Sequence, residues 1–323
     1  MKKCIVIYNP NSGKKKGKQL NIKSYEKIFD KYNYEVEFIP TKYKNHAKEI
    51  MVDLEDKTDL VIAVGGDGTF NEVVTGNLKR KKPLLISLIP FGTTNDIGTM
   101  FGLGKNINKN LNDILSGSIK NIDICSINDQ PFVYVAGFGR FLHVPYDTPR
   151  RLKKRYGYIA YIFEAVKDFL KYATHLYDIT VEVNGEKYKG LASFVLVSNA
   201  NRIAGIKNFY KEVKLNDKKF EVLICNLKTK KDIMRTLFYL RTNDITKVSG
   251  FDFYRTDNLK ITFHEKLRRP WCIDGEKLEE KASVYKIKVI PDIKMLLPNS
   301  ISKELFIDEL WYKIKRNNIF IEL

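Results

Sequence analysis

The sequence predicts two domains, an α/β domain followed by a mainly β domain, on three observations. The chain has 323 residues, which is too long for one ordinary core and comfortable for two. Its first third alternates short apolar runs with helical patterns, whereas strand signals dominate after about Asn121. With 44% apolar and 29% charged residues, the composition is typical of a soluble globular protein and not of a disordered one.

The first domain is predicted to contain a parallel sheet. Continuous apolar runs without alternation indicate strands that are buried on both faces, so helices should cover both sides of this sheet. Ligands of such sheets bind beyond the carboxyl ends of the strands, where each Gly-rich or Asn-rich loop of this region lies. The predicted strands are 4–8, 34–39, 60–64 and 84–89; the predicted helices are a segment ending near Tyr32, then 45–56, 70–78, 96–101 and 107–115.

The second domain is predicted to be antiparallel and rich in hairpins. An Asn-Asp pair divides the apolar stretch 121–137, and an Asn-Gly pair divides 178–199, as hairpin turns do. Further strands are predicted at 220–227, 258–264, 271–279 and 283–290, with one helix at 157–172. The tail at 304–317 is amphipathic and is predicted to pack back as a helix. We therefore assign residues 1–122 with a return at 292–323 to the first domain and 123–291 to the second.

The charge favours anionic partners. Lys and Arg number 56 against 38 Asp and Glu, a net charge of +18. Nucleotides, nucleic acid and acidic membranes all fit this excess, as does a merely solvated surface, but no nucleic-acid recognition motif accompanies it. No run of about 18 apolar residues is present, so a membrane would be met from its surface by a cytoplasmic protein. The four cysteines are far apart and are predicted to be reduced thiols in the core.

The segment Gly65-Gly66-Asp67-Gly68-Thr69 joins a predicted strand to a predicted helix. Glycines there let the backbone approach a ligand, and the start of a helix suits phosphate. Asp67 would repel phosphate directly, but Mg²⁺ between them would bind both. The alternative for an isolated motif of this kind is a tight turn in which Asp67 caps the helix.

Two further loops of similar character favour a phosphate site. The loop 89–96, Ile-Pro-Phe-Gly-Thr-Thr-Asn-Asp, brings a glycine, hydroxyls and a second carboxylate, and the loop 9–13 follows the first strand. Because adjacent strands lie about 4.8 Å apart, Asp67 and Asp96 can share one metal ion. The segment 13–19 is not a Walker A loop, since its glycines are too close together and Gln19 stands where Ser or Thr is needed.

The late segment Ile273-Asp274-Gly275-Glu276 offers a general base. If the substrate is an alcohol, a carboxylate must accept or orient its proton during phosphoryl transfer. Asp274 or Glu276 could do so across an interdomain cleft, although an isolated Asp-Gly pair is more often an ordinary turn. The basic segment 150–156 leads into an apolar, Tyr-rich stretch and could contact acidic lipid headgroups or simply begin a helix.

With these motifs, the chain resembles a bacterial member of the diacylglycerol kinase/sphingosine kinase catalytic superfamily. The resemblance covers nearly the whole chain and rests on NPNSGKKKGK, AVGGDGTFNEVVTG, IPFGTTND, NIDICSINDQPFVYVAGFG, TPRRLKKRYGYIAY, the Leu-Asn-Asp segment and IDGE. NAD kinases share the GGDGT segment, but IPFGTTND followed by a β-rich domain with IDGE favours the lipid branch. The resemblance implies a phosphofructokinase-like three-layer nucleotide domain joined to a β-sandwich, with ATP in the cleft.

The resemblance also implies roles for particular residues. The catalytic Mg²⁺ would lie among Asp67, Asp96 and Asp123, with Asp274 facing it and Glu276 as general base. A second Mg²⁺ would bind Asp217 and the carbonyls of Lys214 and Lys219, but Lys218 replaces the family's glycine in that turn. The implied ATP contacts are Asn9, Pro10, Asn11, Ser12, Gly13, Thr41, Gly65, Gly66, Asp67, Gly68, Thr69, Phe70, Asn71, Thr93 and Thr94.

The function hypothesis is phosphorylation of a lipid hydroxyl by ATP and Mg²⁺, with diacylglycerol as the first choice of acceptor. The enzyme would act as a peripheral protein at the inner, anionic face of the membrane. Alternatives within the enzymes are another lipid, such as phosphatidylglycerol or a sphingoid base, or a soluble acceptor such as NAD. A nucleotide- or lipid-responsive binding protein is the alternative of a different class. A homodimer is one option for the oligomeric state, which the sequence leaves open.

Overall fold

The computed structural model describes residues 1–12, 22–92, 95–139, 175–203, 206–207, 210, 212–226, 229, 232, 250–268, 270–279, 281–301 and 303–307. Most of the first domain lies within these ranges. The basic segment 150–156, the helix predicted at 157–172 and most of the predicted tail helix lie outside them.

A parallel sheet forms the centre of the first domain, as predicted. Its strands run in the order β2-β1-β3-β4, and every neighbouring pair among them is parallel. All six residues of β3 are buried, which is the reason for the unbroken apolar run in the sequence. The strands are β1 (Lys2–Tyr8), β2 (Tyr34–Pro40), β3 (Leu60–Gly65) and β4 (Ile86–Pro90).

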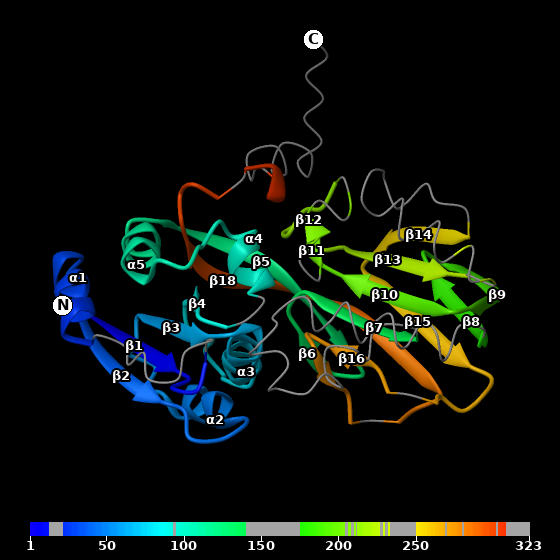
Figure 1. Cartoon of the computed structure of the whole chain (residues 1–323), viewed down its shortest axis with the longest axis horizontal. Coiled ribbons are helices and arrows are strands. Elements are labelled where there is room, and N and C mark those ends of the chain that lie inside the picture. Colours follow the sequence, from blue (N-terminus) through cyan, green and yellow to red (C-terminus); the bar gives the residue numbers. More distant parts are fainter. Residues whose placement is uncertain are drawn as a thin grey trace, which may run out of the picture.

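Helices cover both faces of this sheet (Figure 1). On one face, α1 (Ile22–Lys31) packs near α5 (Ile107–Leu115), and the Tyr32 hydroxyl donates a hydrogen bond to Asn112 Oδ1 at 3.2 Å. On the other face, α2 (His46–Asp53) packs closely on α3 (Asp67–Leu78). A Cβ at Gly76 of α3 would lie 2.6 Å from the Lys48 carbonyl oxygen, so this glycine permits the close approach. A short helix, α4 (Asp96–Met100), follows β4.

Two long strands continue from the first domain into the second (Figure 1). These are β5 (Ser118–Ile127) and β18 (Val284–Leu297), which pair antiparallel along most of their length. The strand predicted at 283–290 therefore extends further, to pair with β4 at its end. An irregularity between Ile290 and Ile293 takes Pro291, which has no N–H, out of the ladder. The domain boundaries expected at 122 and 292 fall inside these two strands.

The second domain is a β-sandwich. One layer continues the large sheet through β5, β18 and β15 to β8 and β9, and the other has the order β14-β13-β10-β7-β16-β17. The additional strands are β6 (Gln130–Phe132), β7 (Val135–Gly139), β8 (Tyr177–Val183), β9 (Glu186–Ala192), β10 (Phe194–Ser198), β11 (Arg202–Ile203), β12 (Ile206–Lys207), β13 (Phe220–Cys225), β14 (Phe251–Thr256), β15 (Asn258–Phe263), β16 (Cys272–Ile273) and β17 (Glu276–Lys277).

Turn chemistry explains the two predicted hairpins. Asn128 and Asp129 have φ of 44° and 66° between β5 and β6, and Asn184 and Gly185 have φ of 52° and 81° between β8 and β9. Positive φ at both central residues is what a tight hairpin turn requires, and Asn, Asp and Gly tolerate it best. The strand expected after the Asn-Gly turn is divided into two strands, β9 and β10. After β9 the chain changes layer at Ser193, whose buried hydroxyl donates to the Cys225 carbonyl at 2.8 Å.

An aromatic core lies between the two layers of the sandwich. Trp271 and Tyr285 are fully buried there, and Phe138 packs edge-on against Phe263 with ring centroids 4.5 Å apart. The four cysteines are buried and free, as predicted. The predicted fold class, α/β followed by a mainly β sandwich, is confirmed. Within the described residues, no helix is long and apolar enough to cross a membrane.

Candidate active site

The loops after the parallel strands meet at one edge of the sheet. Phe91 N donates to Gly65 O at 2.6 Å, so the loops after β3 and β4 are joined backbone to backbone. A Cβ at Gly92 would lie 2.5 Å from Gly66 Cα, so this contact requires glycine. The loop after β1 lies beside them, because Asn9 N donates to Val64 O at 3.0 Å. The structure thus brings the three predicted loops together.

Asp67 is the first residue of α3 but does not cap that helix. Its Oδ2 and Oδ1 accept hydrogen bonds from the backbone N–H groups of Asp96 and Ile97, at 3.2 and 3.3 Å, which begin α4. Asp67 therefore links the two helix starts. Burial, followed by the neighbouring charge of Asp96, raises the pKa of Asp67 to about 7. A positive charge at this position would stabilise the ionised carboxylate.

Asp96 is 1% exposed and has a basic partner that sequence reasoning missed. Arg202 Nε, from β11, donates to Asp96 Oδ1 at 3.0 Å. The two residues are 106 positions apart, so no local pattern in the sequence could have paired them.

The remaining predicted ATP contacts differ in what their side chains do. Thr41 lies at the same edge, where its N–H donates to Tyr8 O at 2.8 Å, and Asn9 Oδ1 accepts from Asn11 N at 2.9 Å. Phe70 is 1% exposed, so only its backbone could reach a ligand. A Cβ at Gly68 would meet no atom of the described residues within 4 Å, so their packing does not require this glycine. Three of the predicted contacts, Gly13, Thr93 and Thr94, lie outside the described residues.

Asp274 joins the two domains. Its Oδ1 accepts hydrogen bonds from the backbone N–H groups of Tyr134 and Val135, at 3.1 and 3.0 Å. Its Oδ2 accepts from Val133 N at 2.6 Å and from Asn71 Nδ2, on α3 of the first domain, at 2.7 Å. Burial raises the pKa of Asp274, while these four donors oppose the rise. Both carboxylate oxygens therefore accept hydrogen bonds, and the one from Asn71 holds the turn against α3.

Glu276 lies on the exposed side of the same turn. Its Oε2 is 3.3 Å from Lys44 Nζ, in the loop between β2 and α2, and both side chains are largely exposed. This ion pair also crosses from one domain to the other. Glu72, on α3, anchors the Lys44 loop by accepting from Asn45 N at 2.9 Å and from Ala47 N at 3.2 Å. Neither Lys44 nor Glu72 was predicted from the sequence.

Asp123 contacts the 214–219 turn. Its carboxylate accepts from Lys218 N at 2.5 Å and from Asp292 N at 3.4 Å, so it belongs with the 214–219 turn. Burial raises the pKa of Asp123 to about 6. Of the three aspartates expected around Mg²⁺, Asp67 accepts from the backbone of Asp96, while the Asp123 carboxylate accepts from the backbones of Lys218 and Asp292.

The Asp67–Asp96 pair has the chemistry of a magnesium site. No three His, Cys, Asp or Glu side chains among the described residues form a group that could hold a metal by themselves. Mg²⁺ does not need such a cage, since it commonly takes one or two carboxylates, waters and the substrate's phosphates. A buried pair of carboxylates beside a helix start, in which the charge of Asp96 raises the pKa of Asp67, fits this requirement.

Comparison with known proteins identifies the family. The model of the diacylglycerol kinase catalytic domain matches residues 3–127. A diacylglycerol kinase of Staphylococcus epidermidis is 32% identical over 224 residues, which is 69% of this chain and 70% of that protein. The chain belongs to the diacylglycerol kinase family. The family prediction is thereby confirmed, and with it the prediction of a lipid kinase.

Other relatives of this family extend the likeness along the chain. A diacylglycerol kinase of Bacillus subtilis strain 168 is 28% identical over 278 residues, covering 85% of this chain and 90% of the relative. The crystal structure of a diacylglycerol kinase from Bacillus anthracis has a TM-score of 0.74 at 20% identity. That alignment covers 93% of this chain and 99% of the other, so the diacylglycerol kinase fold extends through both domains.

Proposed function

We propose that the chain is an ATP- and Mg²⁺-dependent lipid kinase that phosphorylates the hydroxyl of diacylglycerol to give phosphatidic acid. The observation that supports this most directly is the contact between the loops after β3 and β4. It sets Asp67 and Asp96 beside two helix starts, and no atom of the described residues lies within 4 Å of a Cβ built at Gly68. Helix starts and glycine backbones favour phosphate, and paired carboxylates favour the cation that accompanies it. The names of the relatives support diacylglycerol as the acceptor.

In this mechanism Asp67 and Asp96 would hold Mg²⁺, which would neutralise charge on the β- and γ-phosphates of ATP. The loops at Asn9, Gly66 and Gly68 would contact the phosphates through their backbones. The lipid hydroxyl oxygen forms a bond to the γ-phosphorus while the bond from that phosphorus to the β,γ-bridging oxygen breaks, and ADP leaves. Glu276 accepts the hydroxyl proton. Asp274 positions Glu276 by holding the turn against Asn71.

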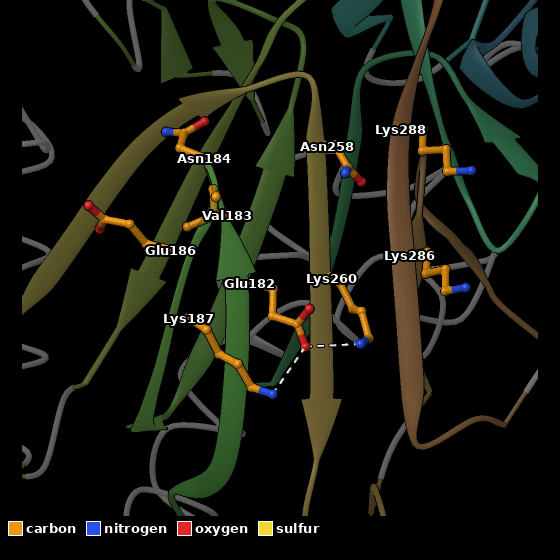
Figure 2. Close-up of a pocket in the computed structure, with 10 residues that line it drawn as sticks. Glu182, Val183, Asn184, Glu186, Lys187, Asn258, Lys260, Lys286 and Lys288 are labelled. Atoms are coloured by element: carbon orange, nitrogen blue, oxygen red, sulfur yellow. Dashed lines mark hydrogen bonds and ion pairs between the residues drawn. The ribbon is translucent and has the colours of Figure 1, made fainter.

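A basic face of the second domain supports an encounter with an anionic membrane. A depression of about 420 Å³ on this face is lined by four lysines from β9, β15 and β18 (Figure 2). Glu182 pairs with Lys260 at 2.9 Å and with Lys187 at 3.8 Å. Lys286 and Lys288 project from β18, and neither has an ion-pair partner among the described residues. We therefore propose a peripheral location at acidic lipid, where each such lysine contributes about 1 kcal/mol.

A panel of acceptors tests the reaction. The full chain is incubated with labelled ATP, Mg²⁺ and mixed micelles that contain diacylglycerol, phosphatidylglycerol or sphingosine, with NAD as a soluble acceptor. Labelled phosphatidic acid is the expected product. Labelling of NAD without any lipid would replace the proposal with an NAD kinase, and absence of product from all acceptors would leave a binding protein.

Two variants test the site residues. Glu276→Gln should still bind ATP but lose roughly 10²-fold or more in turnover, because the proton acceptor is missing. Lys281→Gln, an exposed change in the loop that follows the same turn, serves as a control for folding. An unchanged rate in Glu276→Gln would remove Glu276 as the base.

A further inference from the structure

The 214–219 turn braces the junction between the domains. Asp123 N, on β5, donates to Leu215 O at 2.6 Å, and the Asp123 carboxylate accepts from Lys218 N at 2.5 Å. Asp292, at the irregularity of β18, donates its N–H to the same carboxylate at 3.4 Å. The turn is therefore hydrogen-bonded to β5, and the same Asp123 carboxylate links it to β18, where both strands pass from one domain to the other.

Arg255 supplies the positive charge at this brace. Its Nη2 donates to Asp217 Oδ2, and the other carboxylate oxygen of Asp217 accepts from Lys219 N at 3.0 Å. Arg255 Nε also lies 3.5 Å from Glu221 Oε1, which is on the neighbouring strand directly opposite. The side chains of Asp217 and Glu221 are only 8% and 1% exposed, so water does little to screen their charges.

Lys218 adds a second cation to the same turn. Its backbone has φ of 60°, the left-handed conformation that normally favours glycine, so the turn keeps a glycine-like shape without glycine. Lys218 Nζ lies 3.8 Å from Asp292 Oδ2. A divalent cation at Asp217 would have to share its carboxylate with a guanidinium and lie close to this ammonium group. The donor set of the turn therefore does not fit the second Mg²⁺ that the family resemblance implies.

We infer that Arg255 takes the place of a structural cation in this chain, so that the 214–219 turn stays attached to the junction between the domains without a metal ion. The Asp217 carboxylate is paired with the guanidinium of Arg255, a positive charge that belongs to the chain itself, and Glu221 lies beside the same group. In this respect the fold is independent of the Mg²⁺ concentration, whereas phosphate transfer at Asp67 and Asp96 is not. The inference does not depend on which lipid the enzyme phosphorylates.

Thermal unfolding of the nucleotide-free chain, in EDTA and in millimolar Mg²⁺, tests this inference. The measurement uses an Asp67→Asn background, which removes the other candidate cation site. We expect the same Tm in both buffers. Arg255→Gln should lower the Tm by roughly 5 °C or more, because it leaves buried carboxylates without their cation. Arg255→Lys should recover part of this loss, and Arg268→Gln, at an exposed arginine, should leave the Tm unchanged.

One result would overturn the inference. If Mg²⁺ raises the Tm of the Asp67→Asn chain, and a further Asp217→Asn change abolishes that rise, then Asp217 binds a metal ion despite Arg255. Direct titration of the nucleotide-free Asp67→Asn chain with Mn²⁺ gives a second measure. No stoichiometric binding is expected, and one site that is lost in Asp217→Asn would contradict the inference in the same way.

Discussion

Replacing Asp67 with Asn should abolish phosphate transfer and, at the same time, stabilise the protein at alkaline pH. Burial and the charge of Asp96 raise the pKa of Asp67 from 3.8 to about 7. The native carboxyl group therefore holds its proton more tightly than the unfolded chain does. Its contribution to stability is present at low pH and declines as pH rises from about 4 to about 7. Asn at this position cannot ionise and lacks this decline.

The size of the effect follows from the shift in pKa. About three pKa units correspond to roughly 4 kcal/mol, and residual solvent contact at this half-buried side chain reduces the expected difference to about 2–4 kcal/mol. One hydrogen bond to the backbone of Asp96 or Ile97 is lost in exchange, at a cost of about 1 kcal/mol. The net gain at alkaline pH should therefore be about 1–3 kcal/mol.

Thermal unfolding without Mg²⁺ at about pH 5 and about pH 8 measures this difference. The wild-type Tm should fall by several degrees more than that of Asp67→Asn between the two conditions. Asp53→Asn, an exposed change at the end of α2, should follow the wild type. Equal falls in wild type and Asp67→Asn would refute the reasoning, because the buried charge would then carry no cost.

Three further changes test packing and the link between the domains. Gly68→Ala should leave the Tm unchanged or slightly raised, because an added Cβ meets no atom of the described residues within 4 Å. The KM for ATP should rise, because the Cβ would occupy space proposed for the phosphates; an unchanged KM would place the phosphates elsewhere. Gly76→Ala should cost about 1–3 kcal/mol in unfolding experiments, because its Cβ would lie 2.6 Å from the Lys48 carbonyl oxygen. Asn71→Asp should lower both stability and kcat more than Asn71→Ala, because it sets a second carboxylate against Asp274. Equal effects of the two Asn71 changes would show that the charge of Asp274 is unimportant.

Local signals account for the parts of the fold that could be predicted. The unbroken apolar run of β3 and the Asn-Asp and Asn-Gly turns depend on neighbouring residues only, so the sequence contains them directly. The extension of β18 past Pro291 could not be predicted in this way. It depends on pairing with β5 and β4, which are distant in the chain. The irregularity in the pairing with β5 leaves Pro291 out of the hydrogen-bonded ladder. The change of layer at Ser193 likewise depends on a partner far along the chain.

The candidate site divides in the same manner. Asp67 and Asp96 follow adjacent parallel strands, so their proximity could be predicted from the order of the loops alone. Arg202 and Lys44 could not be predicted, because their partners Asp96 and Glu276 are 106 and 232 residues away. The contact of Asp123 with the 214–219 turn could not be predicted either, since Lys218 is 95 residues away.

The relative position of the two halves of the site depends on one helix. Asp67 begins α3, and Asn71 lies four residues later, one turn along the same face. Asn71 in turn binds Asp274, which belongs to the turn that carries Glu276. A movement of α3 would therefore displace the candidate metal ligand and the candidate base together. Because the paired strands β5 and β18 also pass from one domain into the other, hydrogen-bonded elements set this spacing.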